Sequence, residues 1–327
     1  MKKILGIGNA LVDVMTPIND DSILDLFALP KGSMQLVDSA KSDEVKKGTA
    51  EFKTKLACGG SAANTIHGLG MLGAKTGFIG SVGKDDTGDF FENDLKKAGV
   101  KTYLLRRNTV TGTAVALIST DSERTFATHL GAAVELHAGE LKPEYFKSFN
   151  ILYLEGYLIL DKNLVEAACK AAKKNGMEIA IDLASFNVVN SNIDSFNYII
   201  DRYVDIIFAN EEEAKSFTGL NPEGAVKILS GKGKIAIVKT GKEGSLIMRG
   251  DELIRIGILP VKCVDTTGAG DLYASGFLYG YANGLPLDKC GLIGAVMAGN
   301  VIQAVGAKIP ARKWSGLKNR ISAIINE

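Results

Sequence analysis

The feature that most constrains the fold is a regular alternation of strands and helices after residue 150. Apolar runs of strand length lie at residues 151–154, 178–181, 206–209 and 235–240, and stretches with helical spacing separate them. Parallel strands need such crossover connections, and strands that are buried on both faces read as continuous apolar runs. The pattern therefore predicts an α/β fold with a doubly wound, mostly parallel sheet that is flanked by helices.

Two β-rich segments, at approximately residues 11–38 and 101–128, do not fit that alternation. We predict that they leave the main sheet and form a small β-sheet lid over the carboxyl ends of the strands, where ligands bind in such sheets. A chain of 327 residues can form one α/β domain. We therefore expect a single domain over residues 1–327, with the lid inserted in it.

The charge balance disfavours several classes of partner. The chain has 38 Lys and Arg residues against 37 Asp and Glu residues, a formal net charge of +1. Nothing in this balance favours a nucleic acid or a membrane surface. No apolar stretch reaches the length of a membrane span, and the four cysteines are scattered. We expect a cytoplasmic protein that acts on a small molecule, either as a monomer or as a homodimer formed through the lid.

A glycine-rich turn between two carboxylates is the strongest candidate for chemistry. Residues 265–271 read Asp-Thr-Thr-Gly-Ala-Gly-Asp and lead into an apolar run with helical spacing. The N–H groups at such a helix start, here those of Gly268, Ala269 and Gly270, can hold anionic oxygens. Asp271 can cap the helix, or it can take a proton from a hydroxyl beside the held anion. We favour the general base.

Other phosphate-binding motifs are incomplete. Residues 6–8 begin like a dinucleotide fingerprint, but the third glycine is missing and no crossover helix follows at once. Residues 83–85 and 241–243 resemble the end of a Walker loop without its remaining positions. A Rossmann dehydrogenase and a P-loop NTPase are therefore disfavoured.

Polar residues near the N-terminal half of the chain leave two readings open. Gly59 and Gly60 precede a helix, either as a tight turn capped by Ser61 or as a place where a polyol approaches the backbone and Asn64 binds a hydroxyl. Asp13 stands in an apolar run, where a buried carboxylate is costly without a partner. It either points to solvent or accepts hydrogen bonds from two adjacent sugar hydroxyls.

Polar residues after two later strands also have alternative roles. Asn210 and Glu213 either cap a helix or hold Mg²⁺ and its waters beside a triphosphate. Thr240 and Gly241 could offer a hydroxyl and a close backbone to the same nucleotide. Arg124, in the predicted lid, is a surface charge unless the lid closes over a migrating phosphoryl group.

Together these stretches resemble the PfkB family of carbohydrate and nucleoside kinases, which has the ribokinase-like fold. The most specific match is the turn at residues 265–271, and the Asn-x-x-Glu sequence at residues 210–213 matches a second family motif. The glycines near residue 59 match a third motif, although Ile66 stands where the family prefers a small residue. Within the family, the likeness is greatest to the adenosine kinase branch, in residues 8–13, 33–37, 123–130 and 155–157.

The resemblance implies ATP- and Mg²⁺-dependent phosphoryl transfer to a primary alcohol, most closely the 5′-hydroxyl of adenosine or a related ribonucleoside. It implies that Asp13 binds the ribose, helped by Asn9, Gly59, Gly60 and Asn64. The groups around the purine would be Gln35, Phe126, Tyr157 and Phe186. The alternative acceptor is a free sugar, as in a ribokinase or fructokinase. A catalytically silent nucleoside sensor is disfavoured by the intact turn and Asp271.

The resemblance also implies a nucleotide site. ATP would lie beside Asn210, Thr240, Gly241, Asp265, Thr267, Gly268, Gly270 and Asn300. Mg²⁺ would be held by Glu213 and Asn210. A monovalent cation such as K⁺ would lie near Asp265 and Gly306, and Arg124 would assist the transfer.

Overall fold

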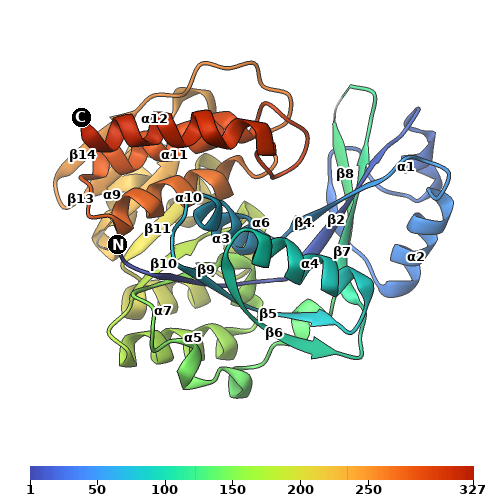
Figure 1. Ribbon diagram of the computed structural model, residues 1–327, viewed down its shortest axis with the longest axis horizontal. Helices are drawn as coiled ribbons and strands as arrows, with labels where there is room; N and C mark the ends of the chain where they lie inside the picture. Colours follow the sequence, from blue (N-terminus) through green and yellow to red (C-terminus); the bar gives the residue numbers. More distant parts are fainter. Residues whose placement is uncertain (122, 234) are drawn as a thin grey trace.

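A nine-stranded sheet runs through the larger part of the computed structural model, which describes residues 1–121, 123–233 and 235–327 (Figure 1). Ser122, in the predicted lid segment, and Lys234 lie outside the described residues. The strand order is β14-β13-β12-β11-β10-β9-β1-β5-β6. In chain order the strands are β1 (Ile4–Ile7), β5 (Thr76–Gly83), β6 (Val100–Arg107), β9 (Ile151–Glu155), β10 (Glu178–Asp182), β11 (Ile206–Asn210), β12 (Ile235–Lys239), β13 (Ser245–Arg249) and β14 (Glu252–Ile256).

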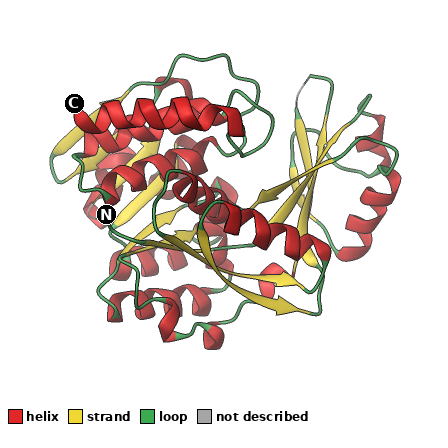
Figure 2. Cartoon of the chain, in the orientation of Figure 1, coloured by secondary structure: helices red, strands yellow, loops and turns green. Residues whose placement is uncertain are grey.

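The seven strands from β12 to β6 are parallel, and β13 and β14 add an antiparallel edge. Helices cover both faces of this sheet (Figure 2). One face packs against α5 (Lys162–Lys174), α7 (Ile193–Tyr203), α8 (Glu211–Thr218) and α9 (Pro222–Lys232). The other face packs against α3 (Ser61–Met71), α4 (Asp86–Lys97), α10 (Ala269–Ala282) and α11 (Leu287–Val301), with α12 (Trp314–Asn326) outside them. The predicted doubly wound α/β fold is confirmed.

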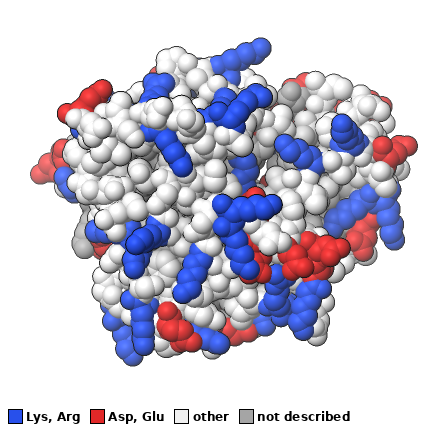
Figure 3. Space-filling model, viewed as in Figure 1, with Lys and Arg blue, Asp and Glu red and all other residues white. Residues whose placement is uncertain are grey.

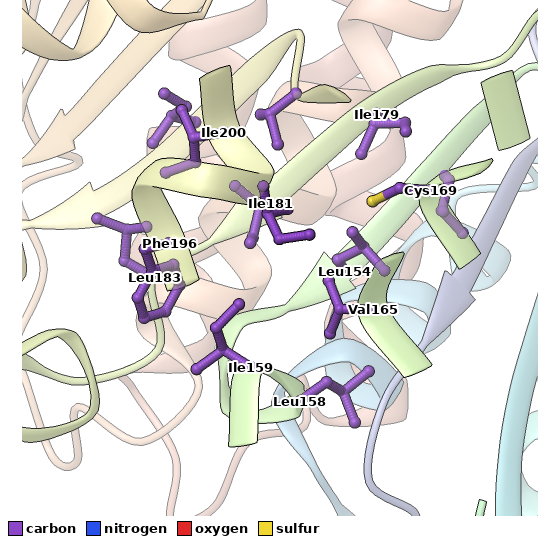
Figure 4. Packing of buried hydrophobic residues seen from close by; sticks show 14 of the residues in the cluster. Leu154, Leu158, Ile159, Val165, Cys169, Ile179, Ile181, Leu183, Phe196 and Ile200 are labelled. Atoms are coloured by element: carbon purple, nitrogen blue, oxygen red, sulfur yellow. The ribbon is translucent and has the colours of Figure 1, made fainter. Parts of the chain in front are cut away.

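The alternation of side chains along each central strand explains why both faces are apolar. On β9, Leu152 and Leu154 enter the core shown in Figure 4, where Val165 and Phe196 from the covering helices meet the strands. Tyr153, one residue away, enters the core on the opposite face. Because both faces are covered, these strands carry few polar residues until their carboxyl ends.

A second sheet of five strands stands beside the main sheet, in the order β3-β8-β7-β2-β4 (Figure 1). Its strands are β2 (Leu11–Pro17), β3 (Met34–Leu36), β4 (Lys55–Gly59), β7 (Thr111–Ile118) and β8 (Arg124–Gly131). Its outer face packs against α1 (Ser22–Leu26) and α2 (Ser39–Gly48), through Leu24, Phe27 and Val45. The inner face of this small sheet lies opposite the carboxyl ends of the main strands, such as Glu155 at the end of β9.

The predicted boundaries of the second sheet need two corrections. Residues 100–107 form β6, which pairs in parallel with β5 at the edge of the main sheet and does not leave it. Residues 55–59, outside the predicted segments, form β4, an edge strand of the small sheet. β6 follows β5 through the crossover helix α4, so it completes a regular βαβ unit. A β-rich composition does not tell which of two sheets a strand joins.

None of the helices within the described residues is long and apolar enough to cross a membrane. On the face shown in Figure 3, positive and negative side chains are interspersed. This distribution agrees with the nearly neutral composition.

Gly276 allows the two helices behind the candidate site to pack closely. A Cβ at Gly276, in α10, would lie 2.6 Å from the Ile293 carbonyl oxygen and 2.8 Å from Gly294 Cα, both in α11. We expect Gly276→Ala to lower the free energy of unfolding by about 1–3 kcal/mol, because backbone atoms cannot yield as a side chain can. Urea unfolding measures this.

Gly316 provides the matched control for that substitution. It lies in the exposed part of α12, and a Cβ there would meet nothing within 4 Å. Gly316→Ala should raise the free energy of unfolding by about 0.5–1 kcal/mol, since alanine favours a helix over glycine. Equal effects of the two substitutions would contradict this account of the α10–α11 contact.

Candidate active site

Four neighbouring parallel strands end in polar side chains. Glu155 ends β9, Asp182 ends β10, Asn210 ends β11 and Lys239 ends β12. Lys239 Nζ donates to Asp182 Oδ2 at 2.8 Å. Because these strands are adjacent and parallel, the four side chains gather at one edge of the sheet, where doubly wound folds bind ligands.

The glycine-rich turn begins α10 at that edge. Gly268 is the N-cap residue with a φ of +75°, and a Cβ there would lie 2.6 Å from Ala307 Cβ. Only glycine meets both demands easily. The first residues of the helix, Ala269 and Gly270, line a cavity, so the amino end of α10 faces open space as an anion-binding turn would.

Asp271 does not cap this helix. Its Oδ1 accepts a hydrogen bond from Ser61 Oγ at 2.8 Å, and its Oδ2 accepts one from the Asn64 side-chain nitrogen at 2.9 Å. Burial raises the pKa of Asp271 above its ordinary value, the bonds from Asn64 and Ser61 oppose that rise, and the charge of Asp182 adds to it. The carboxylate is therefore held in place with a strengthened affinity for protons.

Ser61 and Asn64 reach Asp271 because α3 begins beside α10. Gly60 is the N-cap residue of α3 with a φ of +89°, so the predicted cap by Ser61 is not formed. Asn64 binds Asp271 with its nitrogen, while its buried Oδ1 has no partner among the described residues. The tight turn at Gly60 is observed, and the side chains of Ser61 and Asn64 after it point to Asp271, which follows the glycine-rich turn.

Asp13 faces the same region from β2. A Cβ at Gly59 would lie 2.3 Å from Asp13 Oδ1, so the missing side chain at Gly59 leaves room for this carboxylate. Burial raises the pKa of Asp13 to about 7. Lys308 opposes the rise, and the charge of Asp271 contributes to it. The two carboxylates, from opposite ends of the chain, therefore lie close enough for their charges to act on each other.

Glu155 is a buried carboxylate that the sequence reasoning did not select. It accepts hydrogen bonds from the backbone and side-chain nitrogens of Asn9, at 2.9 and 2.6 Å, and from the Ala62 N–H at 2.9 Å. Burial raises the pKa of Glu155 to about 7. Through these bonds Glu155 connects Asn9 to the start of α3. The sequence did contain a signal for its importance, because Glu155 is a carboxylate at the end of an apolar strand.

A largely apolar cavity of about 430 Å³ lies between the small sheet and the segment after β9. Tyr157 lines it, together with Asn9, Gly60 and Ser61. Its apolar wall includes Leu11, Met34, Leu36, Leu130, Leu136, Leu158, Leu164 and Val188. We call it the first cavity.

Three of the predicted purine contacts lie outside the lining of the first cavity. Met34 and Leu36 line it, so Gln35, between them on β3, faces the other way and donates to Ser33 Oγ at 3.2 Å. Phe126 lies on β8 opposite Met34, and Phe186 is 41% exposed at the start of α6 (Phe186–Ser191). Of the four groups expected around a purine, the structure brings Tyr157 to this cavity.

A second cavity, of about 380 Å³, lies against the glycine-rich turn. Gly241, Thr266, Ala269 and Gly270 line it, and so does Lys239, which the sequence reasoning missed. Its apolar wall comes from Ile258, Leu259, Val261, Ala295, Ala298, Gly299 and Ile302.

Of the eight residues predicted at the nucleotide, Gly241 and Gly270 line the second cavity. The other six lie outside its lining: Asn210, Thr240, Asp265, Thr267, Gly268 and Asn300. Asn300 bonds the Val296 carbonyl oxygen within its own helix at 2.9 Å. Thr240 is buried, and its N–H donates to the Gly244 carbonyl oxygen at 2.8 Å, which shapes the turn that presents Gly241.

Asn210 and Glu213 form a capping box. The Asn210 side chain accepts from the Glu213 N–H at 2.8 Å, and Glu213 accepts from the backbone and side chain of Asn210 at 2.8 and 2.7 Å. Burial and the charge of Asp182 raise the pKa of Glu213. Such concentrated negative charge suits a divalent cation. Across the described residues, however, no group of three His, Cys, Asp or Glu side chains could hold a metal ion, so a cation would also need phosphate or water ligands.

Arg124 joins the small sheet to the glycine-rich turn. Its guanidinium binds Asp265 Oδ2 and Thr267 Oγ1, and it is buried, so the reading as a surface charge is wrong. Asp265 also accepts from the Thr267 N–H at 2.9 Å and the Gly306 N–H at 2.5 Å. Asp265 and Thr267 therefore fix the small sheet against the turn.

Comparison with known proteins identifies the class. A model of the pfkB family carbohydrate kinases matches residues 33–314. The 5-dehydro-2-deoxygluconokinase of Clostridium beijerinckii is 32% identical over 262 residues, 74% of this chain and 77% of that protein. A probable sugar kinase from Rhizobium etli has a TM-score of 0.90 and 31% identity over 99% of both chains. The adenosine kinase from Sinorhizobium meliloti has a TM-score of 0.88 and 32% identity over 98% of this chain and 99% of that one.

The chain therefore belongs to the pfkB family of carbohydrate kinases, and the resemblance noted in the sequence is confirmed. It is a kinase of a sugar or a nucleoside. Kinases of this family generally use ATP with Mg²⁺.

The contact between Arg124 and Asp265 should show strong energetic coupling. Arg124→Met leaves the Asp265 carboxylate buried without its cation, so we expect it to lower the free energy of unfolding by about 3–5 kcal/mol. Adding Asp265→Asn should recover part of the loss, because no unpaired charge remains. Urea unfolding of the four proteins of this double-mutant cycle measures the coupling, and simple additivity would refute the contact.

Asp13 should make stability depend on pH. Its pKa is about 7 in the folded protein against 3.8 ordinarily, so above pH 4 the unfolded chain ionises it first and folding stability falls as pH rises toward 7. Asn cannot ionise. The melting temperature of Asp13→Asn, relative to wild type, should therefore rise between pH 5 and pH 8, by the equivalent of about 1–4 kcal/mol. A difference that does not change with pH would contradict the assignment.

Proposed function

We propose that this chain transfers the γ-phosphoryl group of ATP to the primary hydroxyl of a ribonucleoside, with adenosine as the first candidate. One observation carries the proposal. Asp271 follows Gly270, which lines the second cavity, and it accepts a hydrogen bond from Ser61, which lines the first. A carboxylate held between two cavities, with raised proton affinity, suits a general base between an acceptor and a nucleotide.

In this reaction Asp271 takes the proton of the acceptor hydroxyl, whose oxygen forms a bond to the γ-phosphorus as the bond to the ADP oxygen breaks. The N–H groups of Gly268 and Gly270 face the negative charge on the transferred group, whereas the Ala269 N–H, also predicted to do so, donates to the Thr266 carbonyl oxygen at 3.1 Å. Mg²⁺, when bound, supplies positive charge to the phosphates, and Glu213 and Asn210 would hold it through water. Asp13, supported by Gly59, accepts hydrogen bonds from the ribose hydroxyls.

The choice of a nucleoside rests on the first cavity. Its wall is largely apolar and includes the ring of Tyr157, which suits a flat heterocycle, whereas a free sugar would leave much of that wall without contact. The adenosine kinase from Sinorhizobium meliloti is 32% identical in sequence to this chain. Cytoplasmic purine salvage would be the corresponding role.

We further propose that the small sheet is a lid within one kinase domain. Arg124 holds it on the glycine-rich turn, and a closed lid keeps water from the phosphoryl group. Asp265 has Arg124 and two backbone N–H groups on its oxygens, so a K⁺ ion at Asp265 does not fit this arrangement. We carry no step through such an ion.

A sugar acid is the second candidate acceptor. The 5-dehydro-2-deoxygluconokinase of Clostridium beijerinckii is as similar to this chain as the adenosine kinase. A third cavity, of about 710 Å³, is lined by Lys53, Lys55 and Lys308, and the charge of Lys308 acts on Asp13. An acceptor gripped by Asp13 could therefore meet a cation with its carboxylate.

An acceptor screen tests the proposal. We expect release of ADP to be fastest, by kcat/KM, with adenosine or inosine, compared with ribose, fructose and 5-dehydro-2-deoxygluconate. Asp271→Asn should lower kcat by about 10²–10⁴-fold while calorimetry shows that the acceptor still binds. Turnover of the sugar acid alone would select the second candidate, and an unchanged kcat would remove Asp271 from its role. No turnover with any acceptor would refute the kinase proposal.

A further inference from the structure

We propose that Lys239 is a phosphate-contacting residue of the nucleotide site, and that its ammonium group exchanges Asp182 for the phosphates when ATP binds. This inference rests on the proposed function, because it takes the second cavity as the place of the nucleotide. It concerns a side chain that no motif of the sequence selected.

The position of the ammonium group is the first argument. Lys239 lines the second cavity, and a Cβ at Gly270 would lie 3.0 Å from Lys239 Nζ. The ammonium group therefore lies against the backbone of the helix start, whose first residues Ala269 and Gly270 line the same cavity. An anion held by the amino end of α10 would be within reach of this lysine, so the helix dipole and a full positive charge act at one place.

The partner of Lys239 is the second argument. Its Nζ donates to Asp182 Oδ2 at 2.8 Å, and the side chains are 14% and 7% exposed. An ammonium group has three donors, and a bond to Asp182 uses one of them. Lys239 can turn toward phosphate oxygens without leaving the region, because its long stem is flexible while Asp182 ends a buried strand.

The surrounding charge is the third argument. Asp182, Glu213 and Asp271 all act on Lys239, and the pKa of the ammonium group is raised despite its burial, so it stays charged. A triphosphate that approaches Lys239 also approaches these three carboxylates, which repel it unless a cation screens them. Lys242 also lines the cavity, but Lys239 is the lysine that contacts both Asp182 and the helix start at Gly270.

A purely structural role is the alternative, since a buried Lys–Asp pair can serve only to neutralise the aspartate. The two roles differ in what happens when both partners lose their charge. If Lys239 only neutralises Asp182, then Lys239→Met combined with Asp182→Asn should bind ATP as wild type does. If Lys239 contacts phosphate, the double variant should remain weak.

The experiment is calorimetric titration of the full-length protein with MgATP, in the absence of acceptor. We expect Lys239→Met to raise the Kd for ATP by about 10–100-fold, the effect of one charged hydrogen bond, and the double variant to stay within that range. Lys239→Arg should recover part of the affinity. Circular dichroism and thermal melting check folding, and the double variant supplies the reading if Lys239→Met alone does not fold.

The matched control is a Lys–Asp pair at the opposite end of the strands. Lys173 Nζ binds Asp205 Oδ2 at 2.5 Å, and Asp205 precedes β11 at its amino end. Lys173→Met removes a cation from a buried aspartate far from the cavity lining, so it should leave the Kd for ATP within about threefold, near the error of an equilibrium comparison.

The outcomes separate the two proposals. ATP binding by wild type with the same Kd in Lys239→Met overturns the role of Lys239 alone, as does full recovery in the double variant. An equal loss in Lys173→Met also overturns it, because the effect would then come from stability. A wild-type protein that does not bind ATP overturns both this inference and the proposed kinase reaction.

Discussion

The helices α3 and α10 begin beside each other, and the hydrogen bonds between their first turns determine the geometry of the candidate site. Gly60 starts α3 and Gly268 starts α10, each with a positive φ. The side chains that follow Gly60 bind Asp271, in the first turn of α10, through Ser61 Oγ and the Asn64 nitrogen. Without this contact the carboxylate would have no fixed direction. Asp271 also links the two cavities, since its partner Ser61 lines the first and the preceding Gly270 lines the second.

The same region concentrates carboxylates that are costly to bury. Asp13 and Glu155 have pKa values raised to about 7, and those of Glu213 and Asp271 are raised as well. Such groups oppose folding at neutral pH, because the unfolded chain would ionise them freely. Carboxyl groups with raised pKa values are typical of functional sites. Lys308 lowers the pKa of Asp13, and Lys239 lowers those of Glu213 and Asp271, but neither cancels the rise.

The small sheet converts an open strand edge into an enclosed site. Its helices α1 and α2 cover the outer face, so the inner face can turn toward the main sheet. Arg124 crosses the gap to Asp265 and Thr267, and the strands around it supply much of the wall of the first cavity. The wall of the first cavity and the contact with the glycine-rich turn therefore depend on the same five strands.

Local spacing in the sequence was enough to predict the parallel sheet, the helices on both faces and the glycine-rich turn. These features depend on the period of apolar residues and on the backbone freedom of glycine. Both are properties of short stretches of sequence. Of the predicted residues, Asp13 lies against Gly59, Asn64 bonds Asp271, and the charges of Asp13 and Asp271 act on each other. The family resemblance also rested on motifs that are short and local, and the comparison with known proteins confirmed it.

Only the tertiary structure decided which partners distant residues take. It placed β6 in the main sheet and β4 in the small one, and it turned Gln35 away from the first cavity. It also brought Lys239 beside Asp182 and Gly270. The physical reason is that a strand can pair at either edge available to it, and a buried charge can accept any opposite charge that the packing brings near. Those choices depend on contacts between segments far apart in the chain, which local spacing does not encode.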